Sequence, residues 1–561
     1  MPPATPATAA IYYHPDAYSI GRSDLKGRHA AGAGFLSALA RHHQAPALQC
    51  ATADRRSAVE FARLVEQAAG RPRPVVWLPS SEPAKLAAAG CLFLPGPSLG
   101  DAAWQRRVHD QRAYSLCGVT HTICSNRVMD AFGDYMIAPV QPWDALIVTS
   151  RPARAAIASA LEGWGDYLQS RFGAPALNPI QLPVIPLGVD CDRFADTPEH
   201  RALGTRLRQA HGIGTDDVAV LFFGRLSFHA KAHPLAMFLA CERAQRRSKR
   251  RIHLILTGAA SNPEIEQEFR EGAQRYCPSV NTILLDGSDP AHALSPWFAA
   301  DIFMSLSDNI QETFGLTPIE AMAAGLPVLV SDWDGYRDTI TDTEVGFRIP
   351  TQIPPVGGGQ ELALRHLLEI DSFDRYIGAV SQATAVDSDA AGDALLRLVE
   401  DAGLRHRMGE AGRRRARSLF DWSVVIAAYE RLWEELAQLR ASAPEVAPRH
   451  PDAPAIPLRP DPFVMFQAFA TRQMGLETRL SCPHEAPLAV LDGILASAMN
   501  SFAIGTLLPV EEIRRLLQHL GTAERRLEEL YALVPPERRE RVGRTVGWLV
   551  KCALVEARLA S

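Results

Sequence analysis

Two glutamates, Glu312 and Glu320, are separated by seven residues at the start of a predicted helix. Residues 301–306 predict a buried strand before it, and Thr317, Pro318 and Glu320 predict an N-cap with a capping box. The capping box alone can account for Glu320. Glu312 has no capping role, so we expect its carboxylate to face the ligand-binding edge of a sheet, beside a helix N-terminus that favours phosphate.

Two cations follow another apolar run. Residues 218–224 predict a buried strand that ends in a glycine, and Arg225 and Lys231 come directly after it. An arginine can bind two oxygens of a diphosphate through its planar fork, and a lysine adds a point charge. The alternative is a solvated basic loop without a ligand.

Small residues over positions 27–34 precede a helical pattern at 35–40. Backbone N–H groups in such a glycine-rich turn, Gly32 among them, can approach a phosphate or an acceptor. A glycine-rich turn between a strand and a helix is common, so this feature needs support from elsewhere.

Short apolar runs alternate with helical patterns through most of the chain and predict strands buried on both faces of parallel sheets. This alternation indicates an α/β fold. There are too many runs for one sheet, so we expect two Rossmann-like domains that face a cleft. The runs cover residues 10–13, 75–78, 145–149, 218–224, 252–258, 282–287, 301–306 and 327–331.

The predicted domains follow from where these patterns change. We expect one Rossmann-like domain over 1–194, a second over 195–418 and a long amphipathic helix at 419–440. A Pro-rich linker at 441–462 should lead to an all-helical appendage at 463–561, in which apolar residues recur at helical spacing.

The segment ETFGLTPIEAMAAGLPVLVSD, residues 312–332, resembles the signature of glycosyltransferase family 4. Members of this family are retaining, nucleotide-sugar-dependent enzymes of the GT-B fold. The resemblance implies that Glu312 lies near the donor sugar and that Glu320 binds the donor ribose. It also implies that 1–194 is the acceptor-side domain, that 195–418 is the nucleotide-sugar domain and that the helix at 419–440 crosses back to the first domain. The cofactor-binding set that it implies consists of Arg225, Lys231, Glu320, Gly32, Phe314, Gly315, Leu316 and Thr317.

Further positions fit the same family over about residues 10–440. His121, after the sequence GVT, is similar to the family's histidine at a strand end that faces the sugar, although a lone histidine can also be a packing residue. PLGVD at 186–190 with Phe194 is similar to the family's turn at the domain hinge. One departure is Ala232, where the family usually has glycine after the lysine.

Composition excludes several other classes of protein. The net charge is −5, which is not typical of a general nucleic-acid binder, and the nine cysteines include no C-x-x-C pair. No secretory signal and no run of 18 apolar residues is present, so we expect a cytoplasmic protein. The basic runs at 243–251 and 405–417 predict solvated faces, with anionic lipid at the inner membrane face as the alternative.

We therefore expect a retaining hexosyltransferase that uses UDP- or GDP-sugar and a glycan, lipid-linked or protein acceptor, in bacterial surface glycan synthesis. No metal is expected, because cations and helix N-termini already face the diphosphate and the Asp-x-Asp patterns at 190–192 and 332–334 are short enough to arise by chance. Homo-oligomerisation through the C-terminal segment stays open. The alternatives are an epimerase or phosphorylase of the same fold, or a non-catalytic scaffold.

Overall fold

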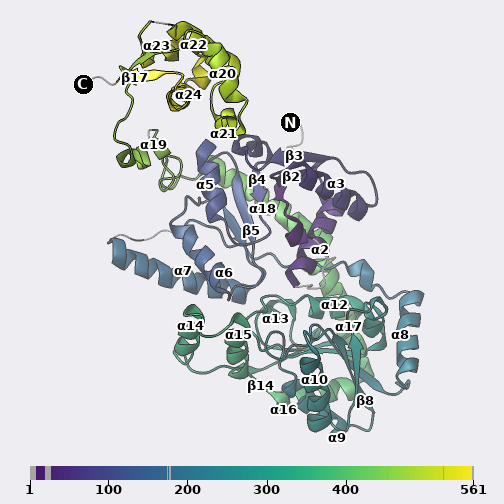
Figure 1. Cartoon of the computed structure of the whole chain (residues 1–561). Coiled ribbons are helices and arrows are strands. Elements are labelled where there is room, and N and C mark those ends of the chain that lie inside the picture. Colours follow the sequence, from purple (N-terminus) through teal and green to yellow (C-terminus); the bar gives the residue numbers. More distant parts are fainter. Residues whose placement is uncertain are drawn as a thin grey trace. The chain divides into compact units, whose positions relative to one another are not determined.

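The structure is a computed structural model and describes residues 8–18, 27–173, 175, 178–451, 453–521 and 523–558. The chain divides into two compact units, Met1–Ile456 and Pro457–Ser561 (Figure 1).

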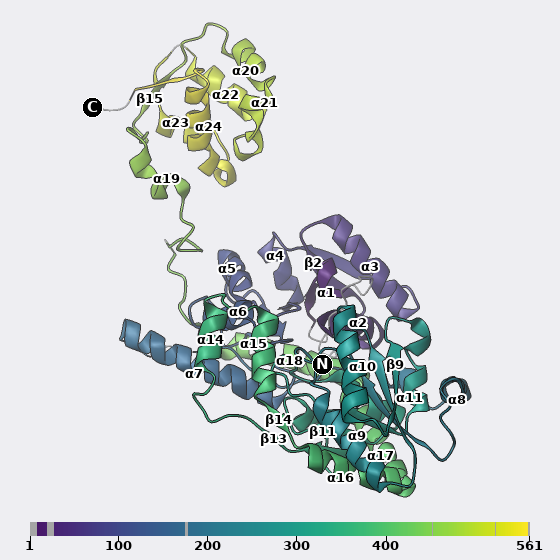
Figure 2. The ribbon, with the colours of Figure 1, turned by 60° about the horizontal axis from the view of Figure 1, so that its bottom comes forward.

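Unit 1 contains two six-stranded sheets whose paired strands run parallel (Figure 2). The order of the first sheet is β3-β2-β1-β4-β5-β6 and that of the second is β12-β11-β10-β7-β8-β9, so each follows the Rossmann order of 3-2-1-4-5-6. The strands of the first sheet are β1 Ala10–Tyr12, β2 Leu48–Thr52, β3 Val75–Pro79, β4 Cys91–Phe93, β5 Ser115–Val119 and β6 Ala145–Ile147. The strands of the second are β7 Val218–Phe223, β8 Ile252–Gly258, β9 Asn281–Asp286, β10 Ile302–Ser305, β11 Val328–Ser331 and β12 Gly346–Ile349.

Helices cover both faces of each sheet, because the strands are apolar on both sides and each face carries its own hydrophobic cluster. We call the first sheet with its helices the first lobe, and the second sheet with its helices the second lobe. The helices of the first lobe are α1 Pro15–Tyr18, α2 Gly27–His42, α3 Arg55–Ala69, α4 Pro83–Leu86, α5 Gly100–His109, α6 Asn126–Gly133 and α7 Arg151–Phe172. Those that follow are α8 Pro198–Ala210, α9 Leu235–Arg247, α10 Pro263–Tyr276, α11 Ser295–Ala299, α12 Leu316–Ala324, α13 Tyr336–Thr339, α14 Gln360–Leu367, α15 Phe373–Gln382, α16 Ser388–Glu400, α17 Ala402–Arg415 and α18 Trp422–Ser442.

The chain passes between the lobes twice, and the two passages lie side by side. Val189 donates its backbone N–H to the carbonyl of Phe420 at 2.8 Å, and Trp422 donates to the carbonyl of Val189 at 3.2 Å. From Trp422 onward, α18 packs its apolar side into the core of the first lobe. The second lobe is therefore joined to the first by two hydrogen-bonded strands of chain and one long helix.

An excursion of the second lobe, residues 353–384, is closed at its base by β13 (Thr351–Gln352) pairing antiparallel with β14 (Ala385–Val386). It contains α14 and α15, which lie side by side (Figures 1 and 2). Ile377 of α15 packs in a small cluster with Ala230 and Cys124, and Ile310 lies against that cluster. The excursion thus covers the loops that follow β5, β7 and β10.

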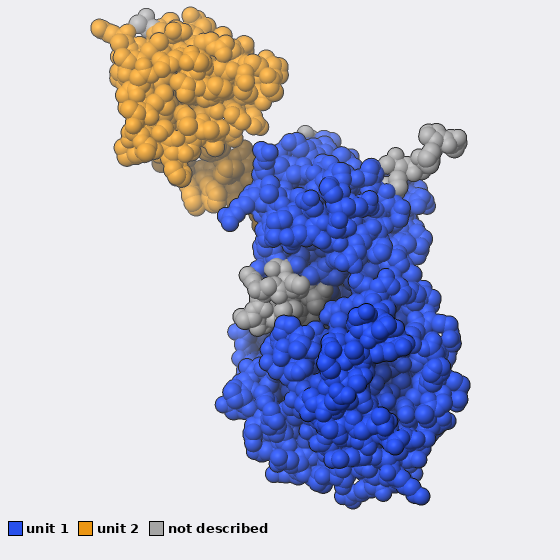
Figure 3. Space-filling model, turned by 90° about the vertical axis from the view of Figure 1, so that its right-hand side faces the viewer, with its two compact units in different colours: residues 1–456 blue, residues 457–561 orange. Residues whose placement is uncertain are grey.

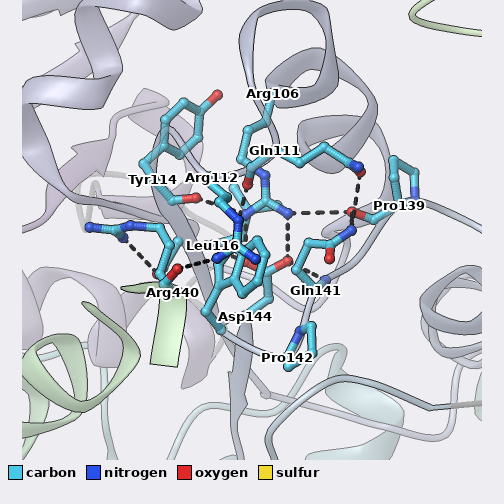
Figure 4. Close-up of polar contacts among 12 residues, drawn as sticks. Arg106, Gln111, Arg112, Tyr114, Leu116, Pro139, Gln141, Pro142, Asp144 and Arg440 are labelled. Carbon is cyan, nitrogen blue, oxygen red and sulfur yellow. Dashed lines mark hydrogen bonds and ion pairs between the residues drawn. The ribbon is translucent and has the colours of Figure 1, made fainter. Parts of the chain in front are cut away.

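A buried polar network holds α5 to the edge of the first sheet (Figure 4). Arg106 of α5 pairs with both carboxylate oxygens of Asp144, at 2.6 and 2.7 Å, and both side chains are fully buried. Backbone N–H groups of Leu116 and Gln141 donate to the same two oxygens, each at 2.8 Å. The network joins α5, β5 and the turn before β6.

The segment after α18 is attached to this part of the first lobe. The side-chain amide of Gln141 donates to the carbonyl of Val446 at 2.9 Å and accepts from its N–H at 2.8 Å. Arg112 donates to the carbonyl of Ala443, and Arg107 to that of Ala455, both at 2.7 Å. Within the predicted linker at 441–462, α18 thus continues to Ser442 and the following chain is hydrogen-bonded to α5 and its neighbours. The bounds of the linker stay a prediction.

Unit 2, orange in Figure 3, has its own hydrophobic core. It is mainly helical, as predicted, and also contains a three-stranded antiparallel sheet of order β16-β15-β17, which we did not predict. Its elements are α19 Pro462–Met465, β15 Arg479–Ser481, α20 Pro487–Leu495, α21 Ala498–Ser501, α22 Val510–Leu520, β16 Arg525–Arg526, α23 Leu527–Ala532, α24 Glu540–Lys551 and β17 Glu556–Arg558. Within the described parts of the chain, no single helix is long and apolar enough to span a membrane. The pair Pro487–Leu495 and Ala498–Thr506, bent by 93°, passes that test only when taken together.

The predicted α/β fold class with two Rossmann-like domains is confirmed. The strands β2, β4, β5 and β12 lie outside the predicted runs. They are short or contain a polar residue such as Gln49, Ser115 or Arg348, so their pattern does not stand out from a loop. The predicted domain boundaries at 194 and 418 stay predictions.

Candidate active site

The order of the second sheet brings two loops together. β7 and β10 are neighbours, although three strand–helix units separate them in sequence. Their connections leave in opposite directions, so a crevice forms beyond their carboxyl ends, which is where ligands bind in such sheets. Arg225 and Lys231 follow β7, and Glu312 follows β10. These residues are far apart in sequence, and the pairing of β7 with β10 brings their loops together.

Lys231 forms an ion pair with Glu312 across this crevice, and each side chain is 18% exposed. Burial of the Glu312 carboxylate would raise its pKa. The charge and hydrogen bond of Lys231, with the N–H groups of Phe314 and Gly315, outweigh burial and lower the pKa below its ordinary value. Glu312 is therefore an ionised carboxylate at neutral pH.

Other contacts tie the two loops to each other. The N–H of His233 donates to Asp308 at 3.2 Å, and Asn309 donates to the carbonyl of His229 at 2.6 Å. The two histidines after Arg225 thus hold the loops through their backbones. Burial raises the pKa of Asp308 to about 6, while the His233 N–H acts in the opposite direction.

Arg225 is exposed and donates to the side chain of Gln311 at 3.2 Å. It therefore lies on the same two loops as Lys231 and Glu312, but without an ion pair to Glu312. Its guanidinium remains accessible to solvent at the edge of the crevice.

The beginning of α12 differs from the prediction. The helix starts at Leu316, its N-cap is Gly315 with φ 82°, and no side chain caps it. Thr317 is the second residue of the helix, so the predicted capping box with Glu320 is wrong. A Cβ on Gly315 would lie 2.1 Å from the ring of Tyr336, so both the backbone angle and the close approach require glycine. Phe314 beside it is buried in the core.

Glu320 is half-buried and lines a cavity of about 360 Å³ between the lobes. Burial raises its pKa to about 7, while the charges of Arg193 and Lys231 lower it. Leu316 is the other predicted site residue that lines this cavity. The remaining walls come from α2, the hinge and the start of α18: Ala31, Gly34, Ser37, Ala38, Arg41, His42, Gly188, Val189, Asp190, Asp192, Arg193, Phe194, Asp421 and Trp422.

The first lobe reaches the Glu312 loop through His121. Thr313 donates its hydroxyl to the carbonyl of His121 at 2.9 Å, and Ser150 donates to the carbonyl of Thr313 at 2.7 Å. The His121 ring contacts the carbonyl of Pro95 at 3.1 Å. The loop that carries His121 therefore adjoins the loop that carries Glu312. The role of His121 stays a prediction.

Gly32 lies inside α2, which begins at Gly27. The prediction of a glycine-rich turn before the helix is therefore wrong. The N–H of Gly32 is at a position where it donates to a carbonyl of the preceding helical turn and is not available to a ligand. A Cβ at Gly32 would lie 2.1 Å from the carbonyl oxygen of Ala17, so close packing of α1 explains the glycine. Residues 19–26, between the two helices, lie outside the described residues.

Sequence reasoning missed Thr313, Asp334 and Tyr336. The loop after β11 brings Asp334 and Tyr336 next to the Glu312 loop, because β11 pairs with β10. The Asp-x-Asp pattern at 332–334 had drawn attention to this loop only as a metal pattern. Asp332 lies 3.3 Å from Arg348, whereas Asp334 accepts from the N–H of Tyr336, so each carboxylate has a separate partner.

Comparison with known proteins adds a family match. Residues 205–354 match the family model described as glycosyl transferases group 1. The phosphatidyl-myo-inositol mannosyltransferase of Mycobacterium tuberculosis is 27% identical over 253 residues, which cover 45% of this chain and 54% of that protein. The D-inositol 3-phosphate glycosyltransferase of Geodermatophilus obscurus is 30% identical over 237 residues, which cover 39% of this chain and 48% of that protein.

Among solved structures, Anabaena HepE in complex with UDP has a TM-score of 0.46 at 18% identity, over 77% of this chain and 100% of that one. A sucrose-phosphate synthase from Thermosynechococcus elongatus has a TM-score of 0.47 at 18% identity, over 78% and 100%.

The chain spans about half the length of the curated relatives it matches. The match to the glycosyl transferases group 1 model lies in the second lobe and includes Arg225, Lys231, Glu312 and Glu320.

Proposed function

We propose that this protein is a retaining glycosyltransferase that moves a hexose from a UDP- or GDP-sugar to a glycan, lipid-linked or protein acceptor, in bacterial surface glycan synthesis. The observation that carries the proposal is the Lys231–Glu312 pair in the crevice between β7 and β10, inside the segment that matches the family model. In this proposal the donor presents its anomeric carbon to the Glu312 carboxylate and its diphosphate oxygens to Lys231.

The donor's diphosphate would bind Arg225, Lys231 and backbone N–H groups at the start of α12, over Phe314, Gly315, Leu316 and Thr317. In this structure the N–H groups of Phe314 and Gly315 face Glu312. Glu320 would accept hydrogen bonds from the ribose hydroxyls. Arg225 is exposed in this structure, so a phosphate can reach its guanidinium without displacing a charged partner.

In the transfer step, an acceptor hydroxyl attacks the anomeric carbon from the face on which the diphosphate leaves. The new C–O bond forms as the bond to the diphosphate oxygen breaks, and the hydroxyl proton passes to that leaving oxygen. Arg225 and Lys231 stabilise the negative charge that develops on the diphosphate. The ionised Glu312 stabilises positive charge on the sugar ring, and His121 borders the sugar from the first lobe.

The acceptor and the compartment are part of the proposal. The two bacterial relatives are named for phosphatidyl-myo-inositol and D-inositol 3-phosphate, which supports an acceptor with ring hydroxyls and keeps a lipid-linked one among the choices. We place the reaction in the cytoplasm, with peripheral contact at the inner membrane face. Residues 457–561 set acceptor choice or oligomeric state.

A test uses radiolabelled UDP- and GDP-sugars with wild-type protein and mixed bacterial glycan and lipid acceptors. Transfer of label to an acceptor, with EDTA present, supports the proposal. Label recovered in an epimerised donor or in a sugar phosphate would replace it with the epimerase or phosphorylase of this fold. Binding in a thermal-shift screen without turnover would indicate a scaffold, and loss of transfer in EDTA would remove metal independence.

A further inference from the structure

Asp334 lies beside the Lys231–Glu312 pair, on a loop that the proposed mechanism does not use. The turn that it begins packs directly against the Glu312 loop, since a Cβ at Gly335 would lie 2.4 Å from the Cα of Phe314. Tyr336 closes the turn, and its hydroxyl is 2.9 Å from that of Ser305 on β10. The position of Asp334 is therefore determined by the same strands that position Glu312.

The backbone of Asp334 is one that glycine would adopt more readily. Its φ is 42°, in the left-handed region. One carboxyl oxygen, Oδ1, accepts the N–H of Tyr336 at 3.0 Å, and such a turn accounts for part of the choice of aspartate. It does not account for the second oxygen.

That second oxygen, Oδ2, is buried without a hydrogen-bond partner. A buried polar atom without a partner costs folding free energy, and most such atoms in native proteins are paired. The charged and titratable groups that face this carboxyl are Glu312, Lys231 and Tyr336.

The same surroundings decide the protonation state. Burial and the negative charge of Glu312 raise the pKa of Asp334 well above its ordinary value, against the opposing effect of Lys231 and of the N–H groups of Tyr336 and Gly335. The pKa of Glu312 is thus lowered and that of the neighbouring Asp334 is raised, so Asp334 keeps its proton to a higher pH than Glu312 does. Two carboxyls whose environments separate their pKa values in this way are typical of sites in which one is an ion and the other a hydrogen-bond donor.

We propose that Asp334 contacts the donor substrate, its free Oδ2 making a hydrogen bond with a hydroxyl of the transferred sugar. A neutral carboxyl both donates and accepts, as a hydroxyl does, whereas a phosphate oxygen accepts only. This inference rests on the proposed function, because it assigns a residue to the same donor site.

The test compares Asp334→Gly with Asp334→Asn in the full chain. Glycine removes the carboxyl and relaxes the backbone, so Asp334→Gly should unfold at the same or a higher temperature than wild type. It should bind the nucleotide sugar about tenfold more weakly, the value of roughly one hydrogen bond, and the free nucleoside diphosphate as tightly as wild type, by titration calorimetry. Asparagine keeps a neutral donor and tolerates this backbone angle, so Asp334→Asn should keep most of the affinity.

The pH profile provides a second measurement. Wild-type affinity for the nucleotide sugar should fall as the pH rises through the raised pKa of Asp334 and the carboxyl loses its proton, and Asp334→Asn should lack that fall. Equal weakening of nucleotide sugar and nucleoside diphosphate in Asp334→Gly, or unchanged affinity for both, would overturn the inference. If wild-type protein binds no nucleotide sugar, the proposed function itself is wrong and this inference goes with it.

Discussion

The two lobes each contain a cation paired with a carboxylate, and the carboxyl groups of the two sites differ in how completely their oxygens are hydrogen-bonded. In the first lobe, both Asp144 oxygens accept from the Arg106 guanidinium and from a backbone N–H, with no exposed surface (Figure 4). In the second lobe, Lys231 and Glu312 each remain partly exposed, and Asp334 next to them has an unpartnered oxygen.

The difference separates a structural pair from a functional one. The buried Asp144 carboxylate accepts four hydrogen bonds and has no capacity left for a ligand. These bonds connect three segments of the chain. The Lys231–Glu312 pair is partly exposed, and burial and the charge of Glu312 raise the pKa of the neighbouring Asp334. Proximity of opposite charges is common to both, so the saturation of hydrogen bonds is the more useful sign of function.

The largest effect on stability is expected at the structural pair. Asp144→Ala leaves the buried Arg106 charge unpaired, which should cost about 3–5 kcal/mol of unfolding free energy, measured by urea denaturation. Replacing both residues, as Arg106→Met with Asp144→Leu, should cost less than the single change. A single variant as stable as wild type would remove the distinction between the pairs.

Glu312→Gln should lower turnover and leave stability nearly unchanged. Removal of the charge that faces the sugar should lower kcat by about 10²- to 10³-fold, with nucleoside diphosphate affinity and the urea midpoint close to wild type. Steady-state kinetics and urea denaturation on one preparation give both values. Wild-type kcat in this variant would exclude Glu312 from the chemistry.

Arg225→Ala and Lys231→Ala should each weaken nucleoside diphosphate binding by roughly ten- to a hundredfold, since a hydrogen bond to a charged group contributes about 1.5–3 kcal/mol. Arg270, which pairs with Glu266 on the surface of α10, is a matched control whose replacement by alanine should leave affinity unchanged. Calorimetry that finds unchanged affinity in both site variants would move the diphosphate elsewhere.

Glu320 should make donor binding depend on pH. Its raised pKa of about 7 means that the carboxyl is neutral below that pH and ionised above it. Because a carboxylate accepts ribose hydroxyls better than a neutral acid, affinity should rise by up to about tenfold between pH 6 and 8. Glu320→Gln should bind with little pH dependence over this range; an unaltered profile would contradict the assignment.

The smallest effect on donor binding is expected from removing unit 2. A chain that ends at Ile456 should bind the nucleotide sugar as wild type does, and should differ in oligomeric state or in transfer to the acceptor, measured by light scattering and by transfer assay. A shorter chain that ends at Ala443 is compared with it for stability. It loses the contacts of residues 445–455 with Gln141 and Arg107 and should be less stable. If the longer truncated chain folds without binding donor, unit 2 is part of the site.

Several features could be predicted from sequence because their signal is local. The runs that became β7, β8 and β11 are apolar throughout, and glycine at position 325 ends α12 as its pattern indicated. Glu312 and the two cations were found because polar residues directly after buried strands must lie at one edge of a sheet. The predicted cap at Thr317 failed because Gly315, which the Tyr336 ring approaches, starts the helix earlier.

The sequence by itself determined the alternation of strands and helices, and with it two parallel sheets and the loops that carry charge. Only the tertiary structure decided which loops meet. The strand order placed β11 beside β10 and so brought Asp334 next to Glu312. The close approach of α1 to α2 accounts for the glycine at position 32. Hydrogen bonds to Gln141 hold a segment whose composition is that of a linker. These outcomes depend on contacts between residues distant in sequence, which a local pattern of residue types does not contain.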